Sequence, residues 1–147
     1  MNNIEKLREQ CKYLLPRDLY FLKNPKAILC VDSALHQNDL TSVNDTSVCR
    51  FGNVSKPIFS QYECVYPNKF GDKDIIRVNG MLTTNKERTI MECLYWDIQI
   101  DLIIEAISDY LDFFNGDLDA LREKAKEYGV LKEFENTIQY LDEYYES

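Results

Sequence analysis

The chain has 147 residues, of which 45% are hydrophobic and 29% charged, and its net charge at neutral pH is −8. These values are typical of one globular domain with a sizeable core, and they exclude a disordered chain. No run of about 18 apolar residues occurs, which excludes a membrane-spanning helix. The N-terminal residues lack a signal-peptide pattern, so we expect a cytoplasmic protein.

The negative charge is concentrated in the second half of the chain. Residues 1–84 carry 11 Lys and Arg against 9 Asp and Glu, whereas residues 85–147 carry 6 against 16. An acidic surface repels phosphate backbones, so we expect no direct nucleic-acid binding and favour a basic protein as partner. Acidic helix faces that serve only solvation are also common, and this alternative stays open.

Metal, cofactor and disulfide chemistry have little support in the sequence. Five dispersed cysteines, an odd number, predict free thiols in a reducing compartment. With one histidine and no Cys-x-x-Cys pair, no metal site is expected. The five glycines form no phosphate-binding loop, so we expect no nucleotide cofactor.

Short helices and strands alternate in the first half. Helical spacing of apolar residues predicts a helix over residues 3–15, which Pro16 ends. A second short helix is expected over residues 32–40. The apolar run 27–31 before it is compatible either with a short buried strand or with the approach to that helix.

The helical period disappears between residues 41 and 80. Three strands are expected at residues 47–51, 58–66 and 75–78, separated by glycine, proline and asparagine. The pair Asn79-Gly80 is typical of a tight turn. A small antiparallel sheet is the simplest arrangement of these strands.

From Thr84 onward the pattern is helical. Thr84 stands three residues before Glu87 and directly ahead of an apolar run, which predicts a capping box at a helix start. Further helices are expected up to Asn115-Gly116, from Asp117 to Gly129, and over residues 131–145. The sequence therefore predicts one α+β domain over residues 1–147, with about three antiparallel strands packed against a C-terminal bundle of three to four helices.

Two groups of side chains are candidates for a partner surface. The acidic residues step by three and four, which predicts a solvated row on one helix face with ordinary pKa values. Aromatic residues crowd the last helix, where they suit a protein interface or a homodimer. The acidic row is Asp97, Asp101, Glu105, Asp109 and Asp112, and the aromatic group is Tyr140, Tyr144 and Tyr145.

Catalysis would have to use His36, the only histidine. Ser33 lies three residues before it and Cys30 six, so a hydrolase with a histidine-assisted nucleophile is a remote alternative. No glycine-rich elbow or oxyanion-hole sequence accompanies these residues. We expect no enzyme activity and assign no catalytic residue.

Two segments resemble the AbiEi-like antitoxins of type IV toxin–antitoxin systems. Residues 31–40, VDSALHQNDL, are similar to the family's "SAL…hgL" helix, and residues 79–94, NGMLTTNKERTIMECL, are similar to its "T-x-x-E-R-T" segment. The likeness extends over roughly residues 27–147. Asn38-Asp39 replaces the family's His-Gly, and Glu92 replaces its usual Asp.

The resemblance implies the antitoxin domain without the family's N-terminal winged helix, and hence without operator binding. It implies phage defence by abortive infection, with a cognate nucleotidyltransferase-like toxin as the antagonised partner. The family motif falls on Thr84, Glu87, Arg88 and Thr89. Because an arginine in a first helical turn opposes the helix dipole, we expect Arg88 to have carboxylate or carbonyl partners and to tie the helix to the sheet. A self-associating or adaptor module with the same fold is the alternative.

Overall fold

The computed structural model describes residues 20–21, 23–41, 48–61 and 63–146, so the helix predicted over residues 3–15 lies outside the described residues. Of residues 144–146 only the backbone is described. The strands are β1 (Ile28–Leu29), β2 (Val48–Gly52), β3 (Ile58–Phe59), β4 (Glu63–Pro67), β5 (Ile75–Val78) and β6 (Met81–Thr84). The helices are α3 (Val31–Gln37), α4 (Lys86–Tyr95), α5 (Ile100–Asp112), α6 (Leu118–Glu127) and α7 (Leu131–Glu146).

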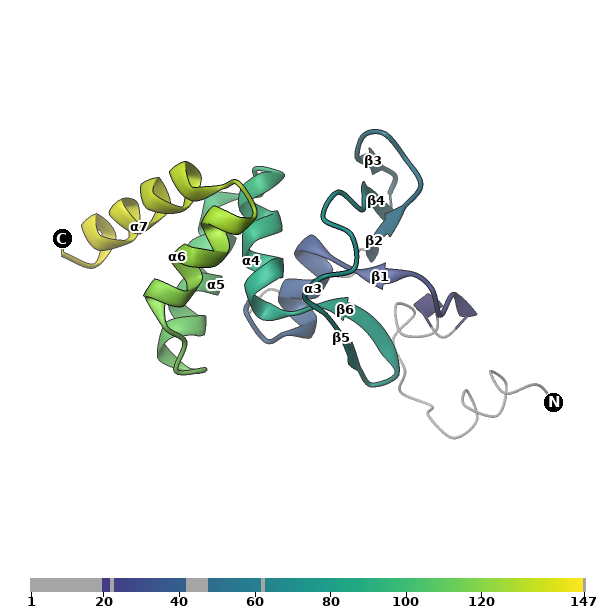
Figure 1. The fold of residues 1–147 in the computed structure, drawn as a ribbon, viewed down its shortest axis with the longest axis horizontal. Coiled ribbons are helices and arrows are strands. Elements are labelled where there is room, and N and C mark those ends of the chain that lie inside the picture. The colour runs from purple at the N-terminus through teal and green to yellow at the C-terminus, as the bar shows by residue number, and fades with distance from the viewer. Residues whose placement is uncertain (1–19, 22, 42–47, 62, 147) are drawn as a thin grey trace.

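A mixed six-stranded sheet lies at one end of the molecule, with α5, α6 and α7 at the other (Figure 1). Its strand order is β3-β4-β2-β1-β6-β5. β1 runs parallel to β6 and β2 parallel to β4, whereas the remaining neighbours are antiparallel. The α+β class is therefore confirmed, but a three-stranded antiparallel sheet is wrong.

The extra strands have no clear local signal. β1 is two residues long, and β6 precedes a helix so closely that its residues read as a helix approach. The predicted strand 58–66 is divided into β3 and β4, which pair with each other. β1 is a strand because it pairs with β2 and β6, and β6 because it pairs with β1 and β5. The pairing of β1 is a long-range property.

The predicted tight turn is present between β5 and β6. Asn79 and Gly80 both have positive φ, 52° and 81°, as a two-residue hairpin turn requires. Val78 pairs with Met81 across it. This hairpin places the end of β6 directly before α4.

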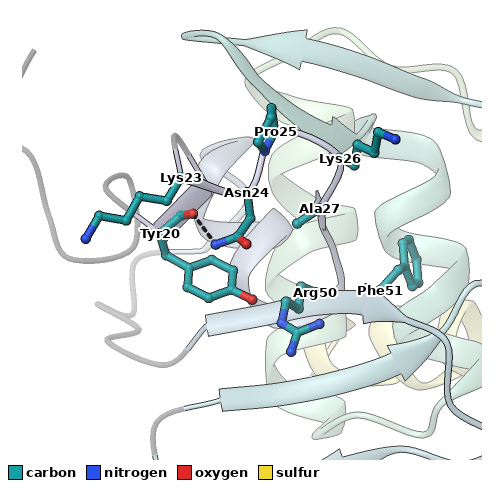
Figure 2. Close-up of a pocket in the computed structure, with 8 residues that line it drawn as sticks. All are labelled: Tyr20, Lys23, Asn24, Pro25, Lys26, Ala27, Arg50 and Phe51. Atoms are coloured by element: carbon teal, nitrogen blue, oxygen red, sulfur yellow. Dashed lines mark hydrogen bonds between the residues drawn. The ribbon is translucent and has the colours of Figure 1, made fainter. Parts of the chain in front are cut away.

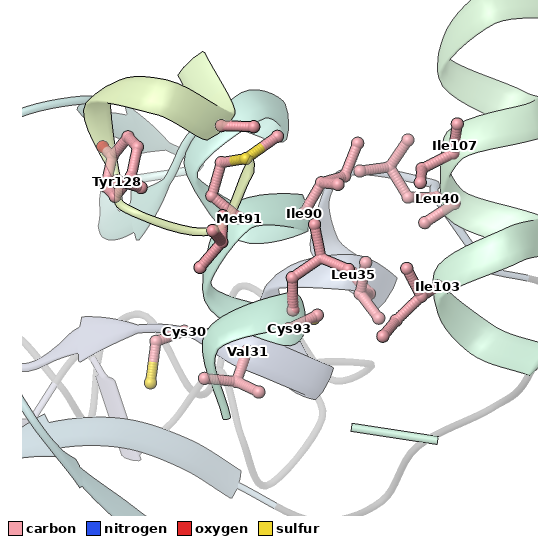
Figure 3. Close-up of a cluster of buried hydrophobic side chains, with 14 of the residues drawn as sticks. Cys30, Val31, Leu35, Leu40, Ile90, Met91, Cys93, Ile103, Ile107 and Tyr128 are labelled. Carbon is pink, nitrogen blue, oxygen red and sulfur yellow. The ribbon is translucent and has the colours of Figure 1, made fainter. Parts of the chain in front are cut away.

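α4 is the central helix of the fold. It packs against α3 and β6 and against α5, α6 and α7, and every residue from 88 to 94 is buried. Figure 3 shows Ile90 and Cys93 of α4 in one cluster with Leu35 of α3 and with Ile103 and Ile107 of α5. Fully burying an aliphatic side chain such as that of Ile90 stabilises the fold by roughly 1.5–3 kcal/mol. Other elements of the fold therefore pack against α4 on several sides.

The later helix ends agree largely with the sequence. The Asp117 carboxylate accepts the Asp119 amide as the N-cap of α6, and Gly129 has the expected positive φ of 73°. α5 ends at Asp112, three residues before Asn115, whose φ is 52°. No helix among the described residues is long and apolar enough to cross a membrane.

Candidate functional site

Helix α4 begins one residue later than the capping box predicts. The N-cap is Asn85, whose side-chain oxygen accepts the Arg88 amide at 2.9 Å. The Asn85 amide donates to the Asp74 carbonyl, also at 2.9 Å. Thr84 cannot act as the cap because it is the last residue of β6, paired with Ile75. The prediction of Thr84 as N-cap is therefore wrong.

Thr84 instead contributes to a buried polar junction. Its hydroxyl lies 2.6 Å from the Thr89 hydroxyl, which donates to the Asn85 carbonyl at 2.6 Å. The Asn38 side chain, at the end of α3, donates to the carbonyls of Ala34 and Thr84. These bonds join α3 to β6 and α4, which come much later in the chain.

Arg88 is fully buried and binds the segment between β4 and β5. Its terminal nitrogens donate to the carbonyls of Gly71 and Lys73, at 2.8 and 2.6 Å, and to the side-chain oxygen of Asn68 at 2.9 Å. The guanidinium carbon also lies 5.1 Å from the centre of the Phe51 ring. The expected carbonyl partners are present, and Arg88 ties α4 to the segment that joins two strands.

The carboxylate partner of Arg88 is Glu92, one turn along the same helix. Arg88 Nε lies 2.6 Å from Glu92 Oε1, and both side chains are almost fully excluded from solvent. Within the described residues, Glu92 Oε2 has no hydrogen-bond partner. Burial raises the pKa of Glu92 to about 7, although Arg88 acts to lower it. Apart from its spacing of four residues from Arg88, nothing in the sequence indicated that this carboxylate is buried.

Glu87 joins α4 to α5. The Tyr110 hydroxyl donates to Glu87 Oε1 at 3.0 Å. Burial, together with this bond and the charge of Glu87, raises the pKa of Tyr110 to about 12. All four motif residues are thus engaged by protein groups, and Thr84, Arg88 and Thr89 are completely buried. They hold the fold together rather than meet a substrate.

The acidic row is shorter than the sequence predicts. Asp97 belongs to the turn between α4 and α5 and has a positive φ of 54°, so it does not share a helix face with the others. Asp101, Glu105, Asp109 and Asp112 lie within α5. The row therefore begins at Asp101, and the break arises because α4 ends at Tyr95.

Three carboxylates of α5 differ from those of α6, because no cation among the described residues pairs with them. On α6, Asp119, Glu123 and Glu127 each pair with a lysine or arginine. On α5, Asp101, Asp109 and Asp112 form no ion pair with any described residue. Burial raises the pKa of Asp109, and the neighbouring charges of Glu105 and Asp112 raise it further. An ordinary pKa is thus the wrong expectation for Asp109.

Two exposed phenylalanines follow the acidic row at the end of α5. From the sequence alone they were not identified as surface residues. The side chain of Phe113 is 77% exposed and that of Phe114 is 40% exposed, although Phe114 continues the apolar stripe of the helix. Lys86 Nζ lies 4.3 Å from the centre of the Phe114 ring. In the sequence, their exposure could have been inferred from their position just past the end of α5, where a side chain no longer faces the core.

The aromatic residues of the last helix are only partly described. Tyr140 on α7 is 50% exposed, as a contact residue would be. The side chains of Tyr144 and Tyr145 lie outside the described residues. The acidic row and Tyr140 belong to different helices, α5 and α7.

The candidate nucleophiles near His36 cannot meet a substrate in this conformation. Cys30 and Ser33 are both fully buried, and the Ser33 hydroxyl accepts the Cys49 amide at 2.8 Å. Burial raises the pKa of the Cys30 thiol well above its ordinary value, which disfavours the reactive thiolate. Among the described residues, no three His, Cys, Asp or Glu side chains are placed to hold a metal ion.

A comparison of the sequence with protein-family models, and another with curated proteins, finds no match. The candidate site therefore rests on its own geometry, which consists of a buried junction at the start of α4 and an acidic surface with exposed phenylalanines on α5.

Proposed function

We propose that the chain is a non-enzymatic, antitoxin-like binding protein of the cytoplasm that antagonises a nucleotidyltransferase-type toxin by contacting a basic surface on it. The resemblance of residues 31–40 and 79–94 to AbiEi-like antitoxins supplies the class of partner. The surface of α5 supplies the mode of contact.

The supporting observation is the surplus of negative charge on α5. Carboxylates that crowd one another without cations raise the free energy of the isolated protein, and a basic partner lowers it by supplying the missing charges. Burial is the main cause of the raised pKa of Asp109, and the neighbouring charges of Glu105 and Asp112 raise it further, as crowded carboxylates should. The paired carboxylates of α6 would gain less from a partner because they already have cations.

Phe113 adds an apolar contact next to these charges. An aromatic side chain that is 77% exposed gains from burial in a partner, and aromatic residues are frequent hot spots in interfaces. Together, Asp101, Asp109, Asp112 and Phe113 form what we name the α5 surface. Steering by its charges would speed association at low salt.

Growth rescue and co-purification test this proposal. The chain is co-expressed with a nucleotidyltransferase-like toxin encoded beside it, and we expect growth to recover and the two proteins to co-purify. The double variant Asp101→Asn, Asp112→Asn and the variant Phe113→Ala should each weaken binding about tenfold or more. The matched control is Glu133→Gln, Glu143→Gln on α7, which removes the same charge and should leave binding unchanged. Equal losses in both double variants, or no rescue by the unaltered chain, would contradict the proposal.

Self-association is the second candidate, because both sheet edges carry exposed apolar residues. On β3, Ile58 is 52% and Phe59 65% exposed, and on β5, Ile76 is 40% exposed. An exposed apolar edge strand can pair with another chain. Sedimentation of the unaltered chain beside Phe59→Lys separates the two candidates, since only a self-associating module would show a dimer that the lysine disrupts.

A further inference from the structure

A cationic pocket lies between residues 20–21 and 23–27 on one side and strand β2 on the other. It has a volume of about 460 Å³, within the range of roughly 300–1,000 Å³ that is usual for small-molecule sites. Figure 2 shows residues 24–27 along one side and Arg50 and Phe51 of β2 along the other. Its lining residues are Tyr20, Lys23, Asn24, Pro25, Lys26, Ala27, Arg50 and Phe51.

The charge of the pocket is opposite to that of the protein. Lys23, Lys26 and Arg50 line it, and no carboxylate among the described residues does, although the chain as a whole carries −8. Glu63 lies just outside the lining and pairs with Arg50, so the charges of the described residues at the pocket still sum to plus two. A positive pocket in an acidic protein indicates an anionic ligand.

Arg50 is held in place before any ligand arrives. Its Nε donates to Glu63, and its guanidinium carbon lies 5.6 Å from the centre of the Tyr20 ring. The Tyr20 hydroxyl donates to the same Glu63 oxygen at 3.3 Å. The Tyr20 hydroxyl also hydrogen-bonds the Arg50 side chain, and Nε is engaged with Glu63, so the remaining N–H groups of the two terminal nitrogens are the donors left for a ligand. These nitrogens are the ones that bind a phosphate or carboxylate in a bidentate manner.

The remaining walls are apolar or aromatic. Pro25, Ala27 and Phe51 contribute hydrocarbon surface, and Tyr20 is only partly buried. We propose that this pocket binds a phosphate monoester with a planar body, of the class of a nucleoside monophosphate. A phosphate monoester carries about −1.5 to −2 at pH 7 and so matches the net charge of the site better than a single carboxylate does.

This inference does not depend on the proposed function. The pocket lies beside β2 at the sheet end of the molecule, whereas the α5 surface is at the helical end (Figure 1). Loss of ligand binding through a pocket variant should therefore leave growth rescue unaffected.

Calorimetric titration with AMP, adenosine and inorganic phosphate tests the site. AMP should bind once per chain, adenosine at least about tenfold more weakly because it lacks the charged group, and inorganic phosphate more weakly than AMP because it lacks the planar body. Arg50→Gln should weaken AMP binding about tenfold or more. Lys132→Gln, a change of the same charge on the distant helix α7, should alter it less than twofold.

The double variant Lys23→Gln, Lys26→Gln gives a second test that leaves the Arg50–Glu63 pair intact. Both lysines are exposed, so the fold should be unaffected and only AMP binding should fall. No binding of AMP at millimolar concentration, equal affinity for adenosine, or an equal loss in Lys132→Gln would overturn the proposal. Equal affinity for inorganic phosphate would overturn the assignment of a planar body.

Discussion

Arg88 and Glu92 form a fully buried ion pair across one turn of the central helix, with 2.6 Å between Arg88 Nε and Glu92 Oε1. Arg88 satisfies its other nitrogens on the segment between β4 and β5, whereas Glu92 Oε2 has no hydrogen-bond partner among the described residues. The arginine is thus well compensated for its burial and the glutamate is not. This asymmetry decides how each should respond to substitution and to pH.

Replacing Arg88 should destabilise the protein strongly. Arg88→Ala leaves Glu92 buried without its cation, and breaking a buried pair in this way costs about 3–5 kcal/mol. Arg88→Lys should also cost on the order of 2 kcal/mol, because one ammonium cannot reach all the acceptors that the guanidinium fork reaches. Urea unfolding followed by circular dichroism measures both losses.

Arg77→Ala is the control for Arg88. Arg77 is exposed and donates to the Gly80 carbonyl at 3.0 Å, so its loss should cost less than about 1 kcal/mol. Unchanged stability in Arg88→Ala together with lost partner binding would show that Arg88 is a contact residue and that its structural role is wrong.

Glu92 should make stability fall as the pH rises through neutrality. Its folded pKa of about 7 lies above the ordinary value of 4.5, so the folded state holds the proton more tightly than the unfolded chain does. The stability present below about pH 4.5 is therefore lost progressively up to about pH 7, by on the order of 3 kcal/mol at most. Urea unfolding at several pH values should show this slope.

Glu92→Gln should remove that slope, because the amide does not titrate. Glu133→Gln on the exposed side of α7 should keep it. The pKa of Asp74 is lowered by its bonds from Tyr128 and Lys124 despite partial burial, so its contribution is lost only at more acidic pH, outside this window. A slope that persists in Glu92→Gln would assign the pH dependence to another group.

Asn85 should behave as the N-cap of α4. Asn85→Ala removes the acceptor of the Arg88 amide and should cost about 1 kcal/mol, whereas Asn85→Asp should cost little because aspartate caps equally well. Thermal or urea unfolding distinguishes them. If Asn85→Ala unfolds at the same urea concentration as the unaltered chain, Thr84 has to be reconsidered as the cap.

The buried thiols should be unreactive in the folded protein. Cys30 and Cys93 are fully excluded from solvent, and burial raises the pKa of both thiols well above 9.0. In a Cys11→Ser, Cys64→Ser background, which removes the partly exposed Cys64, an aromatic disulfide reagent should modify them only after urea unfolds the chain. Rapid modification at neutral pH without denaturant would show that this part of the core opens readily.

The sequence alone determined the features that depend on local spacing. The 3.6-residue period marked α5, α6 and α7, and Asn79-Gly80 marked the hairpin because both residues tolerate positive φ. Asp117 was identifiable as a cap from its own side-chain chemistry. The family-like motif was also readable as a helix start, with an error of one residue.

Only the tertiary structure decided the rest. Thr84 lost the capping role because pairing with β5 extends β6 up to it, and such pairing depends on residues far along the chain. The same holds for the order of the six strands, for the burial of Arg88 and Glu92, and for the pocket beside Arg50. Periodicity identifies which face of an element is apolar, but not which distant segment will cover it. The segment that covers each of these residues decides how deeply the residue is buried, which groups it contacts and which charges surround it.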